Sequence, residues 1–139
     1  MADDLSQLSP ESRCSIQAFI GFYLHRATGE FSRCLREDCT FEGALTAGTL
    51  RGRNLVLAHM KQSLQGPFAE SVLQHLGSTV SGKRVVVRWA AEAPALPEPR
   101  RVDGTSILDL DDHGQIQAIR IEWNPRPLLR GRSRHHGRP

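Results

Sequence analysis

The hydrophobic positions of the chain follow a helical period near the N-terminus and a strand period over its second half. Apolar residues recur at spacings of three and four positions, at Ile16, Phe19, Ile20, Tyr23 and Leu24. Such spacing places them in one broad stripe along a helix. Ser9-Pro10-Glu11 supplies a capping serine, a proline suited to the first turn and an acid that complements the helix dipole. The pattern therefore predicts a helix over about residues 10–26.

The middle of the chain predicts short elements separated by glycines. Thr28-Gly29 ends the first helix, and residues 43–53 contain Gly43, Gly48 and Gly52. The predicted elements are a short helix over about 29–36, a short strand over 39–42, a glycine-rich loop over 43–53 and a helix over about 54–64 with Asn54 as its cap.

A turn signal and a valine-rich run predict the first of two β-hairpins. Ser81-Gly82 precedes a strand over 83–89, and pairing across that turn favours a strand over 70–80 as well. Three prolines then stand close together in the connection that follows. Because proline is excluded from helices and central strands, we expect 93–101 to be an extended loop.

The second hairpin is the strongest local signal in the chain. Alternating runs over about 102–110 and 115–124 flank the turn Asp111-Asp112-His113, and Asn124-Pro125 ends the second run. This order of elements, helices first and long hairpins last, favours few folds, and one of them surrounds a small-molecule pocket.

Charge is distributed unevenly along the 139 residues, whose formal net charge is +3. Residues 126–139 carry five arginines and no acid, so the body without them has a net charge of −2. We expect one domain over residues 1–125 and a basic, disordered tail over 126–139. The tail has no aromatic residue to stack on bases and the body shows no nucleic-acid module, so nucleic acid is not expected as a partner.

Targeting and cofactor signals are weak throughout. No apolar run approaches the ~18 residues of a membrane span, and the acidic start, Met1-Ala2-Asp3-Asp4, differs from a signal peptide. Three cysteines at positions 14, 34 and 39 fit no common zinc spacing, so reduced thiols are expected. We expect a cytoplasmic protein with no membrane partner, no metal and no cofactor.

Three segments carry a family resemblance: Phe31 to Gly43, the step Leu50-Arg51-Gly52, and Asp112 to Ile116. With the order of elements, they resemble the nuclear transport factor 2 superfamily in its SnoaL-like polyketide cyclase and ketosteroid isomerase branch, over about residues 12–125. The resemblance implies an α+β, cone-shaped fold. Three N-terminal helices would pack on a curved, mostly antiparallel sheet that encloses an apolar pocket.

The resemblance also implies which side chains line the pocket. Phe19 and Tyr23 from the first helix, and His59 from the third, are expected to reach it. One parity of each strand faces inward. The expected inward residues are Ser106, Leu108, Leu110, Ile119, Ile121 and Trp123, with Val86, Arg88 and Ala90 on the neighbouring strand. The opposite face would then carry Val87, Trp89, Arg120 and Glu122. A homodimer is expected, and the sequence leaves open which face it uses.

The catalytic groups of the related enzymes are largely replaced. The isomerases' carboxylate base, tyrosine and protonated aspartate fall at Gly43, Phe19 and Ser106. Of the epoxide hydrolase pattern, only Arg88 is kept. The remaining polar candidates for catalysis are Arg88, Ser106, His59 and Glu42.

These observations favour a cofactor-independent cyclase or isomerase that acts on a hydrophobic, polyketide-like intermediate of secondary metabolism. With few acid and base groups, holding a flexible substrate for ring closure, including cycloaddition, would be the main catalytic contribution. Two alternatives stay open. One is a non-catalytic binding or adaptor module of the same fold. The other is a ring-forming enzyme like the epoxide hydrolases, which would need Glu42 and Asp103 or Asp38 to converge near Arg88.

Overall fold

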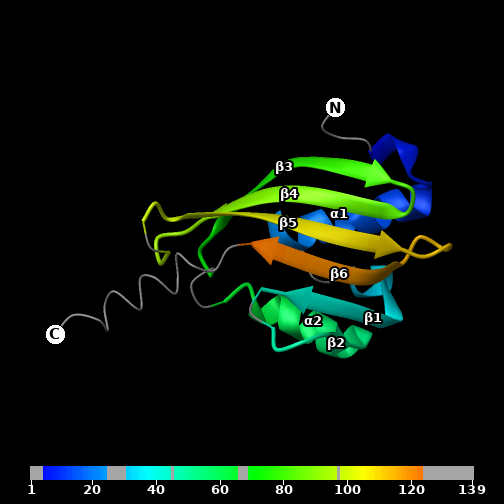
Figure 1. The fold of residues 1–139 in the computed structure, drawn as a ribbon, viewed down its shortest axis with the longest axis horizontal. Helices are drawn as coiled ribbons and strands as arrows, with labels where there is room; N and C mark the ends of the chain where they lie inside the picture. The colour runs from blue at the N-terminus through cyan, green and yellow to red at the C-terminus, as the bar shows by residue number, and fades with distance from the viewer. Residues whose placement is uncertain (1–4, 25–30, 45, 66–68, 97, 124–139) are drawn as a thin grey trace.

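The computed structural model describes residues 5–24, 31–44, 46–65, 69–96 and 98–123. Within them the chain forms two α-helices, two short 3₁₀ turns and six strands (Figure 1). In chain order these are η1 Leu5–Gln7, α1 Pro10–Leu24, η2 Phe31–Cys34, β1 Leu35–Gly43, β2 Leu50–Arg51, α2 Arg53–Gln62, β3 Val72–Ser81, β4 Arg84–Glu92, β5 Arg101–Leu110 and β6 Ile116–Trp123.

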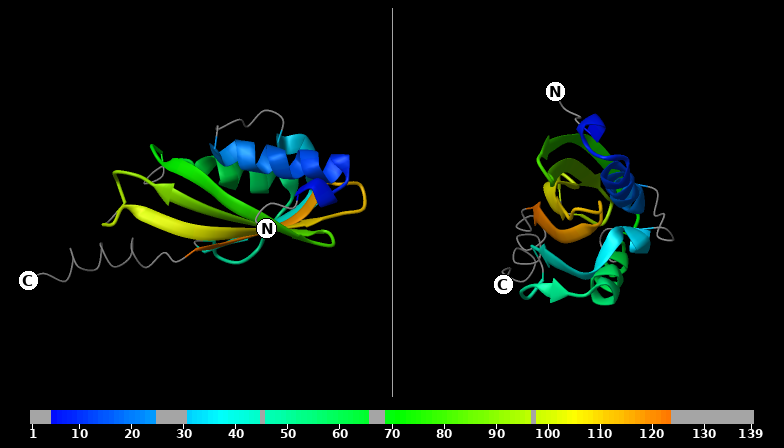
Figure 2. Two further views of the ribbon diagram at one scale, coloured as in Figure 1. Left: turned by 90° about the horizontal axis from the view of Figure 1, so that it is seen from above. Right: turned by 90° about the vertical axis from the view of Figure 1, so that its right-hand side faces the viewer.

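All six strands form one curved sheet in the order β2-β1-β6-β5-β4-β3. Neighbouring strands are antiparallel, except that β1 and β6 run parallel. Figure 2 shows α1 and α2 on the same face of this sheet. The predicted α+β class, with helices on a curved and mostly antiparallel sheet, is confirmed.

Both predicted hairpins are present, and the middle of the chain differs from its prediction. The first hairpin turns at Gly82-Lys83, one residue later than expected, because Ser81 pairs with Arg84. Over 31–36 the predicted helix is instead the turn η2 followed directly by β1, so the described residues contain two α-helices, α1 and α2.

Two further differences lie in the segment before α2. Gly52, with a φ of 99°, takes the cap position of α2, and the expected cap Asn54 lies inside the helix. The loop over 43–53 also contains the two-residue strand β2, which pairs with Thr40 and Phe41 of β1. Residues 126–139, the predicted tail, lie outside the described residues.

Side chains on the inner face form rows that cross the strands, because directly paired residues point to the same side of a sheet. One row is filled by large apolar residues and forms the floor of the core beneath the helices. Its members are Val80, Val85, Leu108, Ile119, Phe41 and Leu50. The α1 side chains Ile16, Phe19 and Phe22 are buried in the same core.

The predicted parity of β4 is wrong by one residue. Val87 pairs with Ser106, which faces inward, so Val85 and Val87 face the core and Val86 and Arg88 face away from it. The same register pairs Arg84 with Asp109 on the outer face, where Nε and Oδ1 lie 2.8 Å apart. A register error of one residue exchanges the two faces of a strand completely.

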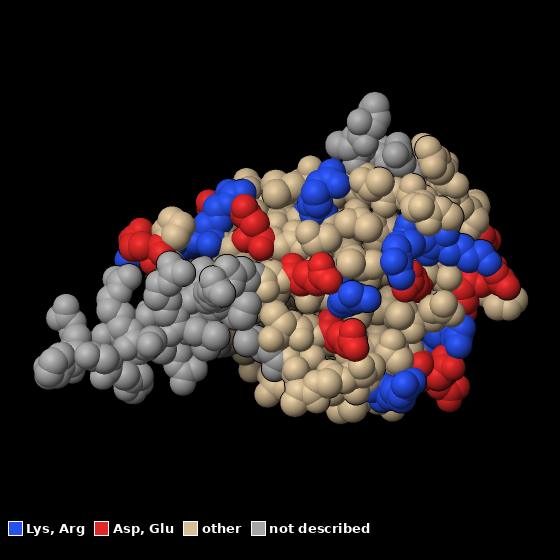
Figure 3. Space-filling model, viewed as in Figure 1, with Lys and Arg blue, Asp and Glu red and all other residues tan. Residues whose placement is uncertain are grey.

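The outer face of the sheet carries charged residues of both signs among uncharged ones (Figure 3). Arg120 lies between Glu42 and Glu122, and Arg101 lies between Glu92 and Asp103. These groups are exposed, so each pair adds little to the free energy of unfolding. Their consequence is to keep the outer face polar while the inner face stays apolar.

The turn between β5 and β6 anchors the sheet to the start of α1. Asp111 Oδ1 accepts hydrogen bonds from the backbone N–H groups of His113 and Gln115. Ser15 Oγ donates a 2.6 Å hydrogen bond to the carbonyl oxygen of Gly114. Gly114 has a φ of 81°, and a Cβ there would lie 2.7 Å from Glu11 Cβ. Only glycine fits this contact without strain.

Replacing Gly114 by alanine is therefore expected to lower the free energy of unfolding by about 2 kcal/mol or more, through strain and the collision with α1. Urea denaturation measures the change. Gly21→Ala is the matched control, since nothing lies within 4 Å of a Cβ in that helical position. It should raise stability by up to about 1 kcal/mol. Equal effects of the two substitutions would contradict the proposed contact.

Candidate ligand cavity

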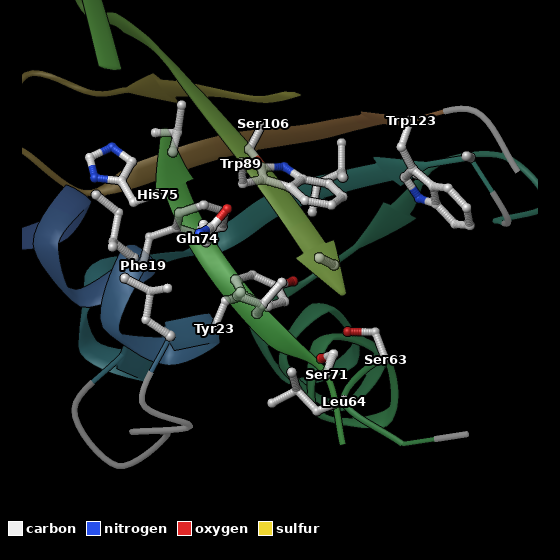
Figure 4. Close-up of a pocket in the computed structure, with 18 of the residues that line it drawn as sticks. Phe19, Tyr23, Ser63, Leu64, Ser71, Gln74, His75, Trp89, Ser106 and Trp123 are labelled. Atoms are coloured by element: carbon white, nitrogen blue, oxygen red, sulfur yellow. The ribbon is translucent and has the colours of Figure 1, made fainter. Parts of the chain in front are cut away.

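A cavity of about 340 Å³ lies between the inner face of the sheet and the helices (Figure 4). Its volume is at the lower end of the range for small-molecule sites. Helix α1 supplies Phe19 and Tyr23, and α2 supplies His59. The sheet supplies His75 from β3, Trp89 from β4, Ser106 from β5 and Trp123 from β6.

The cavity exists because one row of inward residues is small. Next to the floor of the core, the row that crosses from β3 to β1 consists of Ser78, Val87, Ser106, Ile121 and Gly43. Four of these five side chains are valine or smaller. These small side chains leave a space beneath the helices. The larger side chains of the neighbouring row, Leu108, Ile119 and Phe41, fill the space above them. The following row, His75, Trp89, Gly104 and Trp123, forms the wall beyond it.

Trp89 is positioned by a glycine on the next strand. Gly104 pairs directly with Trp89, and a Cβ on Gly104 would lie within 2.5 Å of Trp89 Cε2. The indole therefore lies flat against the Gly104 backbone. Its Nε1–H donates a 3.0 Å hydrogen bond to Ser106 Oγ, and Ser106 is only 2 % exposed. This bond uses an acceptor site of Ser106 and leaves the hydroxyl hydrogen available to donate.

Tyr23 presents a neutral phenol to the cavity. Its ring makes an edge contact with Phe19, with centroids 5.3 Å apart. Burial raises the pKa of the Tyr23 hydroxyl well above its usual range, and a hydrogen bond with Ser63 lowers that pKa by a smaller amount. The phenol consequently keeps its proton at neutral pH and can donate it in a hydrogen bond.

His59 presents a neutral imidazole. Its ring packs against Phe41, with centroids 5.0 Å apart and planes inclined by 58°. Burial lowers the pKa of His59 below its ordinary value of 6.5, because the apolar surroundings disfavour the imidazolium. The uncharged ring can therefore accept a proton at neutral pH.

The described residues that line the cavity include no Asp, Glu, Lys or Arg. The ionisable groups among them are Tyr23, His59 and His75. No cluster of three or more potential metal ligands occurs in the part of the chain that the structure describes. Among these residues there is also no helix both long enough and apolar enough to cross a bilayer.

The structure brings six of the sequence-predicted site residues together around the cavity: Phe19, Tyr23, His59, Ser106, Ile121 and Trp123. Three others, Leu108, Leu110 and Ile119, are buried in the adjoining core. They support the cavity without lining it.

Arg88, Glu42 and two further residues lie elsewhere. Arg88 donates a 3.2 Å hydrogen bond to Thr79 Oγ1 on the outer face. Glu42 accepts a 2.7 Å hydrogen bond from Thr49 Oγ1, also on the outer face. Val86 and Ala90 do not line the cavity either. The outward prediction for Val87 and Trp89 is likewise corrected, since both line it. The strand parity explains all of these differences.

Sequence reasoning missed Trp89 and His75. In each case a glycine lies in the same strand or in the strand paired with it. Gly104 stands opposite Trp89, and Gly77 stands at an irregularity of β3 two residues after His75. A glycine inside a predicted strand marks a bulge or a close approach, although it does not say which partner approaches.

Gly104→Ala is expected to lower the free energy of unfolding by about 1–3 kcal/mol, because the added methyl displaces the Trp89 indole. The same substitution in a Trp89→Leu background should cost less than about 0.5 kcal/mol. Urea denaturation of the four proteins in this double-mutant cycle gives the coupling. Additive effects would show that the indole does not depend on Gly104.

The low pKa of His59 predicts a pH dependence of stability. The unfolded chain binds a proton at His59 more readily than the folded protein does. The free energy of unfolding should therefore fall as the pH drops through about 6.5, and the fall should end below the folded-state pKa. His59→Gln removes this part of the dependence. Urea denaturation at about pH 7.5 and about pH 5.5 compares the two proteins, and identical losses would contradict the assignment.

Comparison with known proteins identifies the family of this chain. Residues 16–119 match the SnoaL-like domain family. No curated protein matches the chain. A nuclear transport factor 2-like protein of unknown function from Mesorhizobium loti is 16 % identical, with a TM-score of 0.70 over 89 % of this chain and 97 % of that one.

Two other solved structures carry functional names. A steroid delta-isomerase from Pseudomonas aeruginosa is 16 % identical, with a TM-score of 0.67 over 93 % of each chain. A protein from Sinorhizobium meliloti, proposed to be a polyketide cyclase, is 18 % identical, with a TM-score of 0.65 over 86 % of this chain and 99 % of that one. At these identities the likeness shows the fold. The family match covers most of the chain, which therefore belongs to the SnoaL-like domain family.

Proposed function

We propose that this protein is a cyclase or isomerase that acts without a cofactor on a hydrophobic, polyketide-like molecule. One observation carries the proposal: an apolar cavity of about 340 Å³ contains neutral acid–base groups and, among its described lining residues, no formal charge. An apolar molecule with one or two oxygens matches such a site. The names of the isomerase and cyclase-like structures of the same fold are consistent with this chemistry.

The proposed reaction begins with proton transfer to His59. Its neutral imidazole takes a proton from a carbon next to a ligand carbonyl, which leaves an enolate and an imidazolium. Ser106 donates a hydrogen bond to the enolate oxygen, and Tyr23 donates a second one when its hydroxyl exchanges Ser63 for the ligand. Return of the proton to a different carbon completes an isomerisation. Attack of the enolate carbon on a second carbonyl forms a ring, and the imidazolium then protonates the new alkoxide.

This mechanism favours base-assisted ring closure over cycloaddition, because an imidazole stands in the cavity while the arginine does not. The aromatic walls Trp89 and Trp123 would hold the reacting ends of the substrate together, and such positioning lowers a barrier without any proton transfer. We also propose that the protein is a homodimer.

The two alternative functions are less well supported. An adaptor module would be expected to fill its cavity with side chains. In this protein the side chains leave a cavity of about 340 Å³ unfilled. The alternative of an enzyme like the epoxide hydrolases needs carboxylates near Arg88. Asp38 is instead paired with Arg36, and Asp103 with Arg101.

The test uses a panel of β,γ-unsaturated cyclic ketones and linear poly-β-ketone thioesters, with products followed by conjugated-enone absorbance and mass spectrometry. We expect turnover of at least one member, and a loss of about 10²–10⁴-fold in kcat for His59→Gln. His113→Gln is the matched control, since His113 is exposed on the hairpin turn, and it should leave kcat unchanged. Tight binding of panel members with no conversion would support the binding-module alternative instead.

A further inference from the structure

The edge strand β3 contains a one-residue bulge at the cavity. From the turn backward, Val80 pairs with Val85 and Ser78 with Val87, and both pairs face inward. Continued alternation would place Leu76 opposite Trp89. The register shifts instead, so that Gly77 pairs with Arg88 and His75 pairs with Trp89. Leu76 is the extra residue.

The bulge exchanges a leucine for a histidine in the cavity wall. Leu76 is 47 % exposed, whereas His75 lines the cavity. Burial preferences favour the opposite arrangement, with leucine inside and histidine outside. Gly77 permits the exchange, because its φ of 152° is one that residues with a Cβ rarely adopt. Bulges are concentrated beside functional sites, where they redirect a side chain.

A buried serine holds the redirected ring. His75 Nε2 lies 2.8 Å from Ser78 Oγ, and Ser78 is 0 % exposed. Because this contact occupies Nε2, the nitrogen left for another partner is Nδ1. His75 makes no other hydrogen bond to the described residues of the chain. The ring is therefore oriented before any ligand arrives.

His75 and Trp123 stand at opposite ends of one row. The row runs from His75 through Trp89 and Gly104 to Trp123 and crosses four strands. With about 4.8 Å between neighbouring strands, it spans about 14 Å. Figure 4 shows His75 at one side of the cavity, Trp123 at the other and Trp89 between them. A flat molecule lying along the indoles would place one end at His75.

We infer that His75 is a specificity-determining residue that hydrogen-bonds a ligand oxygen through Nδ1. The cavity then selects flat, apolar molecules with a hydroxyl or carbonyl group at the β3 end over hydrocarbons of the same shape. This inference rests on the proposed function only in requiring that the cavity binds an apolar molecule. The inference assigns no proton transfer to His75, whereas the proposed function assigns proton transfer to His59.

The test compares 2-naphthol with naphthalene, which differ by one hydroxyl group. That hydroxyl can donate or accept, so it suits either tautomer of His75. The chain has two tryptophans, Trp89 and Trp123, and both line the cavity, so their indole N–H resonances report binding in NMR titrations. We expect the wild-type protein to bind 2-naphthol about 5- to 10-fold more tightly than naphthalene.

His75→Phe keeps a ring of similar size and removes both nitrogens. It should reduce the preference to about one while naphthalene affinity stays unchanged. Leu76→Gln, which changes the exposed residue of the same bulge, is the matched control and should keep the preference. In the wild-type protein, 2-naphthol should also shift the Nδ1 resonance of His75 while naphthalene does not. This second measurement requires no variant to fold.

Different failures have different meanings. Equal affinity for the two probes, or a preference that persists in His75→Phe, would overturn the inference and leave the proposed function standing. If neither probe moves an indole resonance, the cavity does not take flat apolar molecules, and both proposals are overturned.

Discussion

The close contact between Trp89 and Gly104 is the constraint on which the cavity depends. It requires that β4 and β5 pair in one register, with the indole directly opposite the residue that lacks a side chain. That register places Ser106 within hydrogen-bond distance of the indole N–H. It also sets the inward parity of β4, and so assigns Arg88 to the outer face. One cross-strand pair thus determines a wall of the cavity, its buried hydroxyl and the exclusion of a cation.

Exclusion of charge defines what chemistry the cavity can support. Desolvation raises the pKa of Tyr23 and lowers that of His59, and both shifts favour the neutral form. The resemblance to isomerases implied a carboxylate base at the position of Gly43. A neutral imidazole differs from a carboxylate because proton transfer to it creates a pair of opposite charges, which attract strongly where water is excluded. Burial of neutral groups is therefore compatible with acid–base catalysis here.

The polar residues on the two faces of the sheet have different kinds of partner. On the outer face, acids and bases neutralise one another at the surface, as in the Arg120 pairs with Glu42 and Glu122. On the inner face, two pairs of polar side chains orient one another. Ser106 accepts from Trp89, and Ser78 holds His75. Buried polar groups are stable only when they are bonded, so these pairings decide which polar residues the cavity can contain.

The sequence alone determined the first helix and both hairpins, because these depend on local periodicity and turn residues. The α+β class followed from the order of these elements through the family resemblance. The sequence also placed Phe19, Tyr23, His59 and Trp123 near one pocket through the family resemblance. It could not determine the parity of β4 or the entry of His75 into the cavity. Both follow from pairing between strands that are distant along the chain. A shift of one residue, in register or by a bulge, exchanges the faces of a strand while the local pattern of hydrophobic residues stays the same. Only the tertiary structure, which sets each strand against its neighbour, decides which face is inside.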